Sequence, residues 1–163
     1  MNRKRVFLGG PIQNISNSDR QVNYKDKTLI LKIVHSLQNS EIDVFSAHME
    51  EKFGSEIPNI QEICRRDYKW MKECDVFCLL MLHNDNGFIR SDGACIELGW
   101  AFSMGKPIIL IAEPLYLQNA SALLQGLIFE SVAEIVPIDD LENNVTLLAD
   151  SIKRINTSCS AAY

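Results

Sequence analysis

The sequence predicts an α/β fold: a doubly wound, Rossmann-like or flavodoxin-like parallel sheet of five strands with helices on both faces. Short apolar segments alternate with longer segments whose apolar residues recur every three or four positions, as in amphipathic helices. The apolar segments are continuous, which is typical of strands buried on both faces of a parallel sheet. Because the chain has 163 residues and no internal repeat or linker, we expect a single domain.

In the first half of the chain, a strand is predicted at 6–9, because its apolar run ends in Gly9-Gly10-Pro11, which turns the chain. A long helix is predicted over 19–38, where apolar residues are spaced to share one face. A second strand follows at 42–45. The second helix, over 60–72, again gathers its apolar residues on one face.

The second half begins with a continuously apolar strand at 75–82. A third helix, over 93–104, opens from a polar loop that contains glycine, and a fourth strand is expected at 107–112. The tail at 156–163 is rich in Ser and Ala and is expected to fray. Between the fourth strand and this tail we expect a short helix at 121–129, a strand at 134–137 and a closing helix at 140–155.

Composition excludes several classes of protein. The net charge of −5 argues against a nucleic-acid-binding surface, which needs clustered Lys and Arg. No apolar run approaches the roughly 20 residues of a membrane span, and the start of the chain does not resemble a signal peptide. We therefore expect a cytoplasmic protein. The five cysteines lack paired metal-ligand spacing, so no metal site is predicted and Cys74 and Cys78 are expected to be buried free thiols.

The fold class predicts where a site would lie. In open parallel sheets, ligands bind beyond the carboxyl ends of the strands, where the strand order reverses. Glu97 begins the helix after the third strand, so it faces this crevice. Small and apolar residues surround it, and burying an unpaired carboxylate is costly, which favours a function. The alternative is a solvent-facing acid near a helix N-terminus.

Asp67 is a second candidate acid, because it lies on the apolar face of its predicted helix. It is either a boundary residue paired with Arg65, Arg66 or Lys69, or an acid or base that works beside Glu97. A pair of carboxylates suits cleavage of a glycosidic bond, in which one attacks the anomeric carbon and another group assists proton transfer.

These segments resemble one enzyme family, the nucleoside 2-deoxyribosyltransferase superfamily, over residues 6 to about 126. That superfamily includes the transferases, the nucleoside 5′-monophosphate N-glycosidases and the CMP hydrolases. The spacing from Asp67 to Glu97 is its specific part. The residues that carry the resemblance are Phe7-Leu8-Gly9-Gly10-Pro11-Ile12, Asp67 eight residues before Asp75, Asp92-Gly93, Glu97-Leu98-Gly99 and Gly105-Lys106-Pro107.

The resemblance implies a role for each of three residues. Glu97 matches the nucleophile that attacks C1′ and forms a covalent glycosyl-enzyme intermediate. Asp67 matches an aspartate implicated in proton transfer. Ser121 matches a serine that reaches the phosphate bound by a neighbouring subunit, which implies a homodimer with shared sites. The residues expected to contact substrate from the first turn are Phe7, Gly9, Gly10, Pro11, Ile12 and Gln13.

Departures from the family pattern distinguish its branches. Ser91 stands where the transferases carry an acid that holds the 5′-hydroxyl, whereas the monophosphate glycosidases have serine. A hydroxyl and the Gly93 amide at a helix N-terminus can bind a phosphate. Phe7 replaces a tyrosine found in many members and resembles the CMP hydrolases, which accept ribose. Gln13 replaces an arginine of several members, and Arg20 or Arg90 is a candidate substitute.

Two polar residues near the crevice have alternative interpretations. His48 follows the second strand and either contacts the base or phosphate or is an ordinary loop histidine. Asp92 either assists at the sugar or caps the following helix.

The sequence therefore predicts an enzyme that hydrolyses a pyrimidine nucleoside 5′-monophosphate, with CMP or a modified CMP favoured. Glu97 attacks C1′ with proton transfer through Asp67, and Ser91, Gly93 and Ser121 bind the phosphate. The products are free base and ribose 5-phosphate, and no metal or organic cofactor is needed. The alternatives are a deoxyribosyltransferase, in which a second base intercepts the intermediate, and a non-catalytic nucleotide-binding module.

Overall fold

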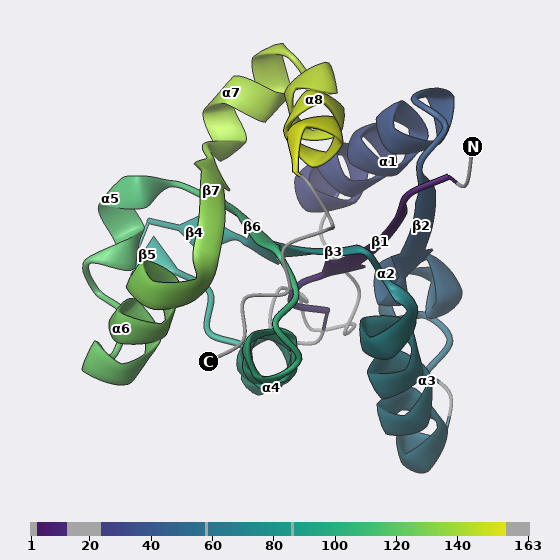
Figure 1. Ribbon diagram of the computed structural model, residues 1–163, viewed down its shortest axis with the longest axis horizontal. Helices are drawn as coiled ribbons and strands as arrows, with labels where there is room; N and C mark the ends of the chain where they lie inside the picture. Colours follow the sequence, from purple (N-terminus) through teal and green to yellow (C-terminus); the bar gives the residue numbers. More distant parts are fainter. Residues whose placement is uncertain (1–2, 13–23, 58, 86, 156–163) are drawn as a thin grey trace.

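The computed structural model describes residues 3–12, 24–57, 59–85 and 87–155 (Figure 1). Its main sheet has the strand order β2-β1-β3-β6-β7, and every neighbouring pair is parallel. This arrangement confirms the predicted α/β fold with five strands. The strands are β1 (Arg5–Gly9), β2 (Asp43–Ser46), β3 (Val76–Met81), β6 (Ile108–Ala112) and β7 (Val132–Val136).

The three central strands are buried on both faces, as their continuous apolar sequences predict. The register pairs Leu8 with Cys78 and Cys78 with Ile109, so these side chains form a row across one face. Phe7 and Phe77 lie one position earlier in their strands and point to the opposite face, because successive strand residues alternate. Cys74 and Cys78 are buried free thiols, as predicted.

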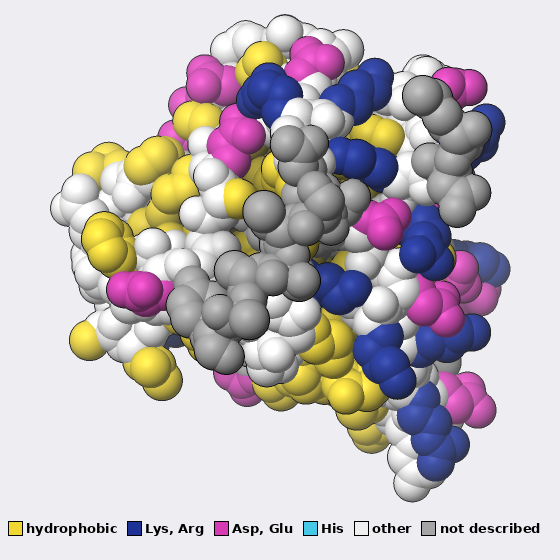
Figure 2. Space-filling view, in the orientation of Figure 1, with side chains coloured by type: hydrophobic (Ala, Val, Ile, Leu, Met, Phe, Trp, Pro, Cys, Tyr) yellow, Lys and Arg dark blue, Asp and Glu magenta, His cyan; other side chains and the backbone are white. Residues whose placement is uncertain are grey.

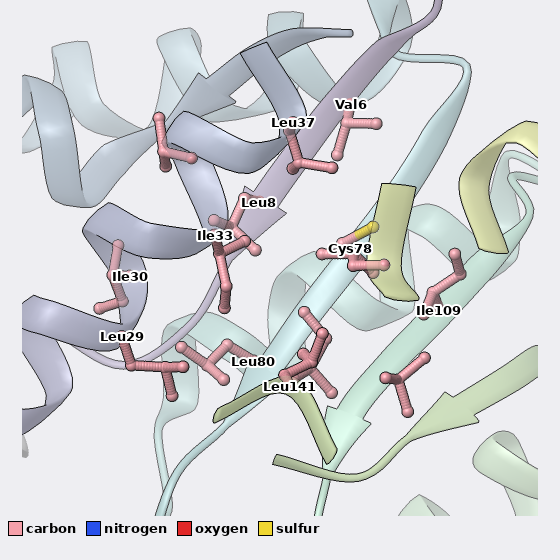
Figure 3. Close-up of a cluster of buried hydrophobic side chains, with 14 of the residues drawn as sticks. Val6, Leu8, Leu29, Ile30, Ile33, Leu37, Cys78, Leu80, Ile109 and Leu141 are labelled. Atoms are coloured by element: carbon pink, nitrogen blue, oxygen red, sulfur yellow. The ribbon is translucent and has the colours of Figure 1, made fainter. Parts of the chain in front are cut away.

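Helices cover both faces of the sheet (Figure 1). On one face, α1 (Tyr24–Asn39), α7 (Ile138–Asn143) and α8 (Thr146–Arg154) enclose an aliphatic core. Figure 3 shows side chains of α1, such as Ile33 and Leu37, beside the strand residues Leu8 and Cys78. Leu141 of α7 belongs to the same cluster. On the other face, the core is completed by α3 (Ile60–Glu73), α4 (Asp92–Ser103) and α6 (Ala122–Ser131).

The closing helix differs from the prediction, because 140–155 is divided into α7 and α8. Asn144 is extended, with φ −144° and ψ 90°, and its side-chain oxygen accepts hydrogen bonds from the Thr146 backbone and hydroxyl at 3.3 and 2.9 Å. Asparagine favours such local bonds over a continuing helix. The last predicted strand also begins earlier, at Val132 instead of 134.

Several short elements were not predicted, since none is long enough to show a periodic pattern. They are α2 (Ala47–Glu50), a single 3-10 turn η1 (Lys52–Gly54), the hairpin of β4 (His83–Asn84) and β5 (Gly87–Phe88), and α5 (Pro114–Leu117). Among the described residues, no helix is both long and apolar enough to span a bilayer. The predictions for Gln13, Arg20, the start of the first helix and the tail at 156–163 lie outside the described residues.

Candidate active site

A cleft of about 280 Å³ opens at the carboxyl end of β1, between α3 and the start of α4. The strand order reverses at β1, because β2 lies on one side of it and β3 on the other. This is the position at which open α/β sheets bind ligands. The cleft is lined by Gly10, Ile12, Ala47, Glu51, Ile63, Asp67, Ser91, Asp92, Gly93, Ala94 and Glu97.

Glu97 reaches this cleft from the inner face of α4 and is only 9% exposed. Its Oε2 atom is buried and has no hydrogen-bond partner among the described residues. The carboxylate occupies the space beside Gly9, at the end of β1. A Cβ atom added to Gly9 would overlap Glu97 Oε2 and lie 2.9 Å from the Phe77 ring. Glycine at this strand end therefore makes the room that the carboxylate fills.

The environment of Glu97 disfavours its charge. Burial raises the pKa of Glu97 well above its ordinary value, and the nearby Asp67 carboxylate raises it further. The Arg66 guanidinium lowers this pKa and Glu51 raises it, and both effects are smaller than that of burial. A poorly solvated carboxylate is a good nucleophile once it is ionised.

Asp67 lies across the cleft on α3 and is 7% exposed. Its Oδ1 accepts a hydrogen bond of 2.8 Å from Arg66 Nε. Burial raises the pKa of Asp67 despite this arginine. The structure thus shows the pairing with Arg66 that the sequence offered as one alternative, and it places Asp67 in the same cleft as Glu97. An acid with a raised pKa is suited to proton transfer.

The turn after β1 supplies Gly10 and Ile12 to the cleft, but Phe7 lies in the core below it. The Phe7 ring packs against Trp70 and Phe77, at centroid distances of 5.7 and 5.4 Å. Phe7 therefore shapes the floor of the site from beneath and does not line its wall.

His48 lies beneath the same turn and is fully buried, so its ring is not open to the cleft. Its Nε2 lies 3.1 Å from the Pro11 carbonyl oxygen, which can only accept, so Nε2 carries the hydrogen. Burial lowers the pKa of His48 to about 4, so the ring is neutral at physiological pH. In this arrangement His48 fixes the turn that carries Gly10. It lies on α2 with its ring buried, so it is not the ordinary loop histidine that was one of the two alternatives offered by the sequence.

The N-terminus of α4 forms the other wall. Ser91 is the N-cap of the helix, and its hydroxyl oxygen accepts from the Ala94 amide at 3.3 Å. Asp92 is the first helical residue and lines the cleft, so it is not the cap of the helix, which was one of the two alternatives offered by the sequence. Gly93 follows in the first turn. Backbone amides and the dipole of a twelve-residue helix favour an anion here.

Two predicted phosphate-site residues lie outside the cleft walls. Ser121 is the exposed N-cap of α6, and its hydroxyl oxygen accepts from the Leu124 amide at 3.3 Å. It is not among the residues that line the cleft of this subunit. Arg90 is exposed in the loop before α4. Among the described residues, no group of three or more His, Cys, Asp or Glu side chains is arranged to hold a metal ion.

Glu51 is a cleft residue that was not singled out from the sequence. It follows α2, is 4% exposed, and its Oε1 accepts a hydrogen bond of 2.7 Å from Arg66 Nη2. The only sequence signal for it is its position after the second strand, at the edge of the sheet where the site was expected. Its partnership with Arg66 joins residues fifteen positions apart, which no local pattern reveals.

Comparison with known proteins identifies relatives with this fold. The family model for nucleoside 2-deoxyribosyltransferase matches residues 6–136. A solved structure described as the Clostridium botulinum CMP N-glycosidase BcmB shares 24% identity with a TM-score of 0.59, covering 90% of this chain and 98% of that one. The solution structure of BlsM shares 22% identity with a TM-score of 0.70, covering 96% and 98%.

A third structure is described as a 2-deoxyribosyltransferase from Bacillus psychrosaccharolyticus. It shares 19% identity with a TM-score of 0.54, covering 85% of this chain and 90% of that one. No curated protein matches this chain. At these identities the solved structures establish the common fold.

Proposed function

We propose that this chain, which belongs to the nucleoside 2-deoxyribosyltransferase family, hydrolyses the N-glycosidic bond of a pyrimidine nucleoside 5′-monophosphate. The observation that carries the proposal is the buried Glu97 carboxylate, which lies in the space left by Gly9 and shares the cleft with Asp67. Two buried carboxylates at a sheet edge suit a displacement at an anomeric carbon. CMP or a modified CMP is the favoured substrate.

The reaction proceeds in two displacements. A Glu97 oxygen forms a bond to C1′ as the bond from C1′ to the base nitrogen breaks, and the electron pair of that bond leaves with the base. Proton transfer through Asp67 neutralises the departing base. Water then attacks C1′ and gives a proton to Asp67 as the bond from C1′ to Glu97 breaks. This step releases ribose 5-phosphate and regenerates the Glu97 carboxylate and the Asp67 acid.

The start of α4 supports a phosphate-bearing substrate. The Ser91 hydroxyl can donate to a phosphate oxygen while its own oxygen accepts from Ala94. The Gly93 amide lies in the first turn, where the helix dipole favours an anion. An acid at position 91 would repel the phosphate, so serine there favours a nucleotide over a nucleoside. Because Asp92 lines the cleft, we expect it to accept hydrogen bonds from sugar hydroxyls.

A homodimer is part of the proposal, because Ser121 does not line the cleft of its own subunit. Large apolar side chains are exposed on the two helices nearest Ser121: Leu123 and Phe129 on α6 are 83% and 87% exposed, and Ile96 on α4 is 53% exposed. In Figure 2, separate hydrophobic side chains project at α6, and a larger hydrophobic group lies beside α4, toward α3. An exposed apolar surface of this kind is typical of a subunit interface.

A second candidate is base exchange, because the matching family model is that of a nucleoside 2-deoxyribosyltransferase. In that reaction a second base attacks C1′ of the glycosyl-Glu97 intermediate in place of water. Both candidates need Glu97, so they are separated by their products, with and without an acceptor base.

The decisive experiment measures release of free base from ribo- and deoxyribonucleosides and from their 5′-monophosphates. We expect release from a pyrimidine monophosphate by the wild type, loss of release in Glu97→Ala, and normal release in Glu62→Ala. Glu62 is a matched control because it is an exposed acid on α3. Base release that occurs only in the presence of an acceptor base would identify the enzyme as a transferase and not as a hydrolase. If wild type and Glu97→Ala bind nucleotide equally and neither turns it over, the chain is a non-catalytic nucleotide-binding module.

A further inference from the structure

We propose that Arg66 is a positioning residue for this reaction: with Glu51 it orients Asp67 and supplies the cation that lets Glu97 react as an anion. This inference rests on the proposed function. Neither Arg66 nor Glu51 takes part in the two displacements, yet the half-buried Arg66 binds Asp67, and Glu51 binds Arg66 and lines the same cleft. Their arrangement places one cation beside a cleft that four acids line: Glu51, Asp67, Asp92 and Glu97.

The guanidinium of Arg66 is held on three sides. Its Nε donates to Asp67 Oδ1 at 2.8 Å, and its Nη2 donates to Glu51 Oε1 at 2.7 Å. Its third contact is the Trp70 ring one helical turn later, with Cζ 4.7 Å from the ring centroid. Trp70 in turn stacks on Phe45 of β2, at 5.6 Å and 2° between the ring planes. The sheet thus fixes the ring, and the ring fixes the guanidinium.

The contact between Arg66 and Asp67 needs this support. Adjacent residues on a helix do not face one another, so an arginine must fold back to reach the carboxylate that follows it. The side chain pays for this conformation with rotamer entropy, which the Trp70 and Glu51 contacts offset. Because Arg66 holds one oxygen of Asp67, it fixes the orientation of the Asp67 carboxylate beside the cleft.

Burial makes these ion pairs different from those on the surface. The side chains of Arg66, Asp67 and Glu51 are 18%, 9% and 5% exposed. Charge-assisted hydrogen bonds in such surroundings are stronger than exposed ones, and removing one partner leaves the other charge buried and unpaired. Loss of Arg66 would therefore disturb both Asp67 and Glu51.

The charges around Glu97 give Arg66 its second role. Glu51 and Asp67 both bind the Arg66 guanidinium and line the same cleft as Glu97, so these three acids and one arginine carry two net negative charges when all are ionised. Asp92 on α4 lines the same cleft, and the buried His48 is neutral, with its pKa lowered to about 4. Phe77 and Gly9 face Glu97 from the sheet and offer no charge. The positive charge of Arg66 opposes protonation of Glu97, and the negative charge of Glu51 favours it.

The test compares Arg66→Met, Arg66→Lys and Glu51→Gln with Arg65→Met. Arg65 is the matched control, because it is the exposed arginine immediately before Arg66 on α3. Since a positioned acid or base contributes about 10²–10⁴-fold, Arg66→Met should lower kcat by about 100-fold. Lysine lacks the planar fork that holds two carboxylates, so Arg66→Lys should recover only part of this loss. Arg65→Met should leave kcat unchanged.

The pH profile separates this role from a purely structural one. Glu97 must be ionised to attack C1′, so kcat/KM rises with pH through its pKa. Removing the cation in Arg66→Met should raise that pKa and move the acid limb to higher pH. Removing an anion in Glu51→Gln should move the limb to lower pH. If both variants fold and lose kcat while the acid limb of each stays at the wild-type pH, the proposal is overturned.

A readout independent of activity keeps this proposal distinct from the proposed function. Carbon-13 NMR titration of the Glu97 carboxyl, assigned by Glu97→Gln, should show the same opposite shifts in Arg66→Met and Glu51→Gln. If the wild type releases no base from any nucleotide, the proposed function falls while this titration still decides the role of Arg66. If Arg66→Met does not fold, Arg66→Lys and Glu51→Gln give the answer, and an unmoved titration in both overturns the inference.

Discussion

Gly9→Ala tests the position of the nucleophile directly. Gly9 ends β1 and pairs with Leu79 of the central strand, so the backbone at this point is held in the core of the sheet. The added methyl group would overlap Glu97 Oε2 and lie 2.9 and 3.1 Å from two carbons of the Phe77 ring. The Phe77 ring is itself fully buried, so the Glu97 side chain is the group that must move.

Two effects follow, and their sizes can be stated. Overpacking of a buried site costs about 1–3 kcal/mol in the free energy of unfolding. A reacting group displaced by about 1 Å can lose roughly 100-fold in rate, so kcat/KM should fall by about that factor or more. The backbone of Gly9 lies outside the region reserved for glycine, so the effects arise from the side-chain overlap alone.

The assay measures base release and urea unfolding for Gly9→Ala, with Gly99→Ala as the control. Gly99 lies on α4, the helix of Glu97, and a Cβ there meets nothing within 4 Å. Because alanine is favoured over glycine inside a helix, the control should gain about 0.5–1 kcal/mol and keep its activity. Wild-type kcat/KM in Gly9→Ala would refute the reasoning.

A double-mutant cycle identifies the partner in the overlap. In a Glu97→Ala background, Gly9→Ala should cost less stability, because the carboxylate that it meets is gone and only the Phe77 contacts remain. An equal cost in both backgrounds would show that Glu97 does not occupy the space beside Gly9.

Three further predictions concern the acid, the phosphate end and the partner subunit. Because the folded state raises the pKa of Glu97 above its ordinary 4.5, ionisation removes stability as pH rises from that value; Glu97→Gln should therefore be more stable than wild type at pH 8 in thermal melts, with the gain shrinking toward pH 5. Ser91→Asp should raise KM for monophosphates at least about tenfold by repulsion and leave KM for nucleosides nearly unchanged, and a uniform rise would argue against a phosphate site. Mixing Glu97→Gln with Ser121→Ala subunits should restore activity to about a quarter of wild type if sites are shared across a two-fold dimer, whereas no restoration would place each site within one subunit.

The sheet and its main helices were predictable from local pattern. Continuous apolar runs indicated parallel strands buried on both faces, and spacing of three and four residues indicated the helices. The break at Asn144 was not predicted, because the apolar spacing continues across it while the asparagine side chain bonds to the residues ahead. Elements of two to four residues, such as α2 and the hairpin of β4 and β5, are too short to display a period.

The candidate site was predictable where it depends on strand ends and helix starts. Glu97 and the start of α4 follow a strand, and open parallel sheets place such residues at one edge. His48 shows the limit of this reasoning. Its position after β2 is as expected, yet whether its ring faces the cleft or the core depends on the packing of Pro11 above it.

The sequence by itself determined the architecture and the placement of the two carboxylates in one cleft. The spacing of apolar residues within each segment predicts the buried elements, and the fold class then predicts where the strand ends meet. Only the tertiary structure decided how those carboxylates are set. The space at Gly9 exists because β1 and α4 approach there, and the Arg66 clamp joins α3 to the segment after α2 over the Trp70 ring. Contacts between elements distant in the chain depend on strand register and side-chain rotamers, which no single segment specifies.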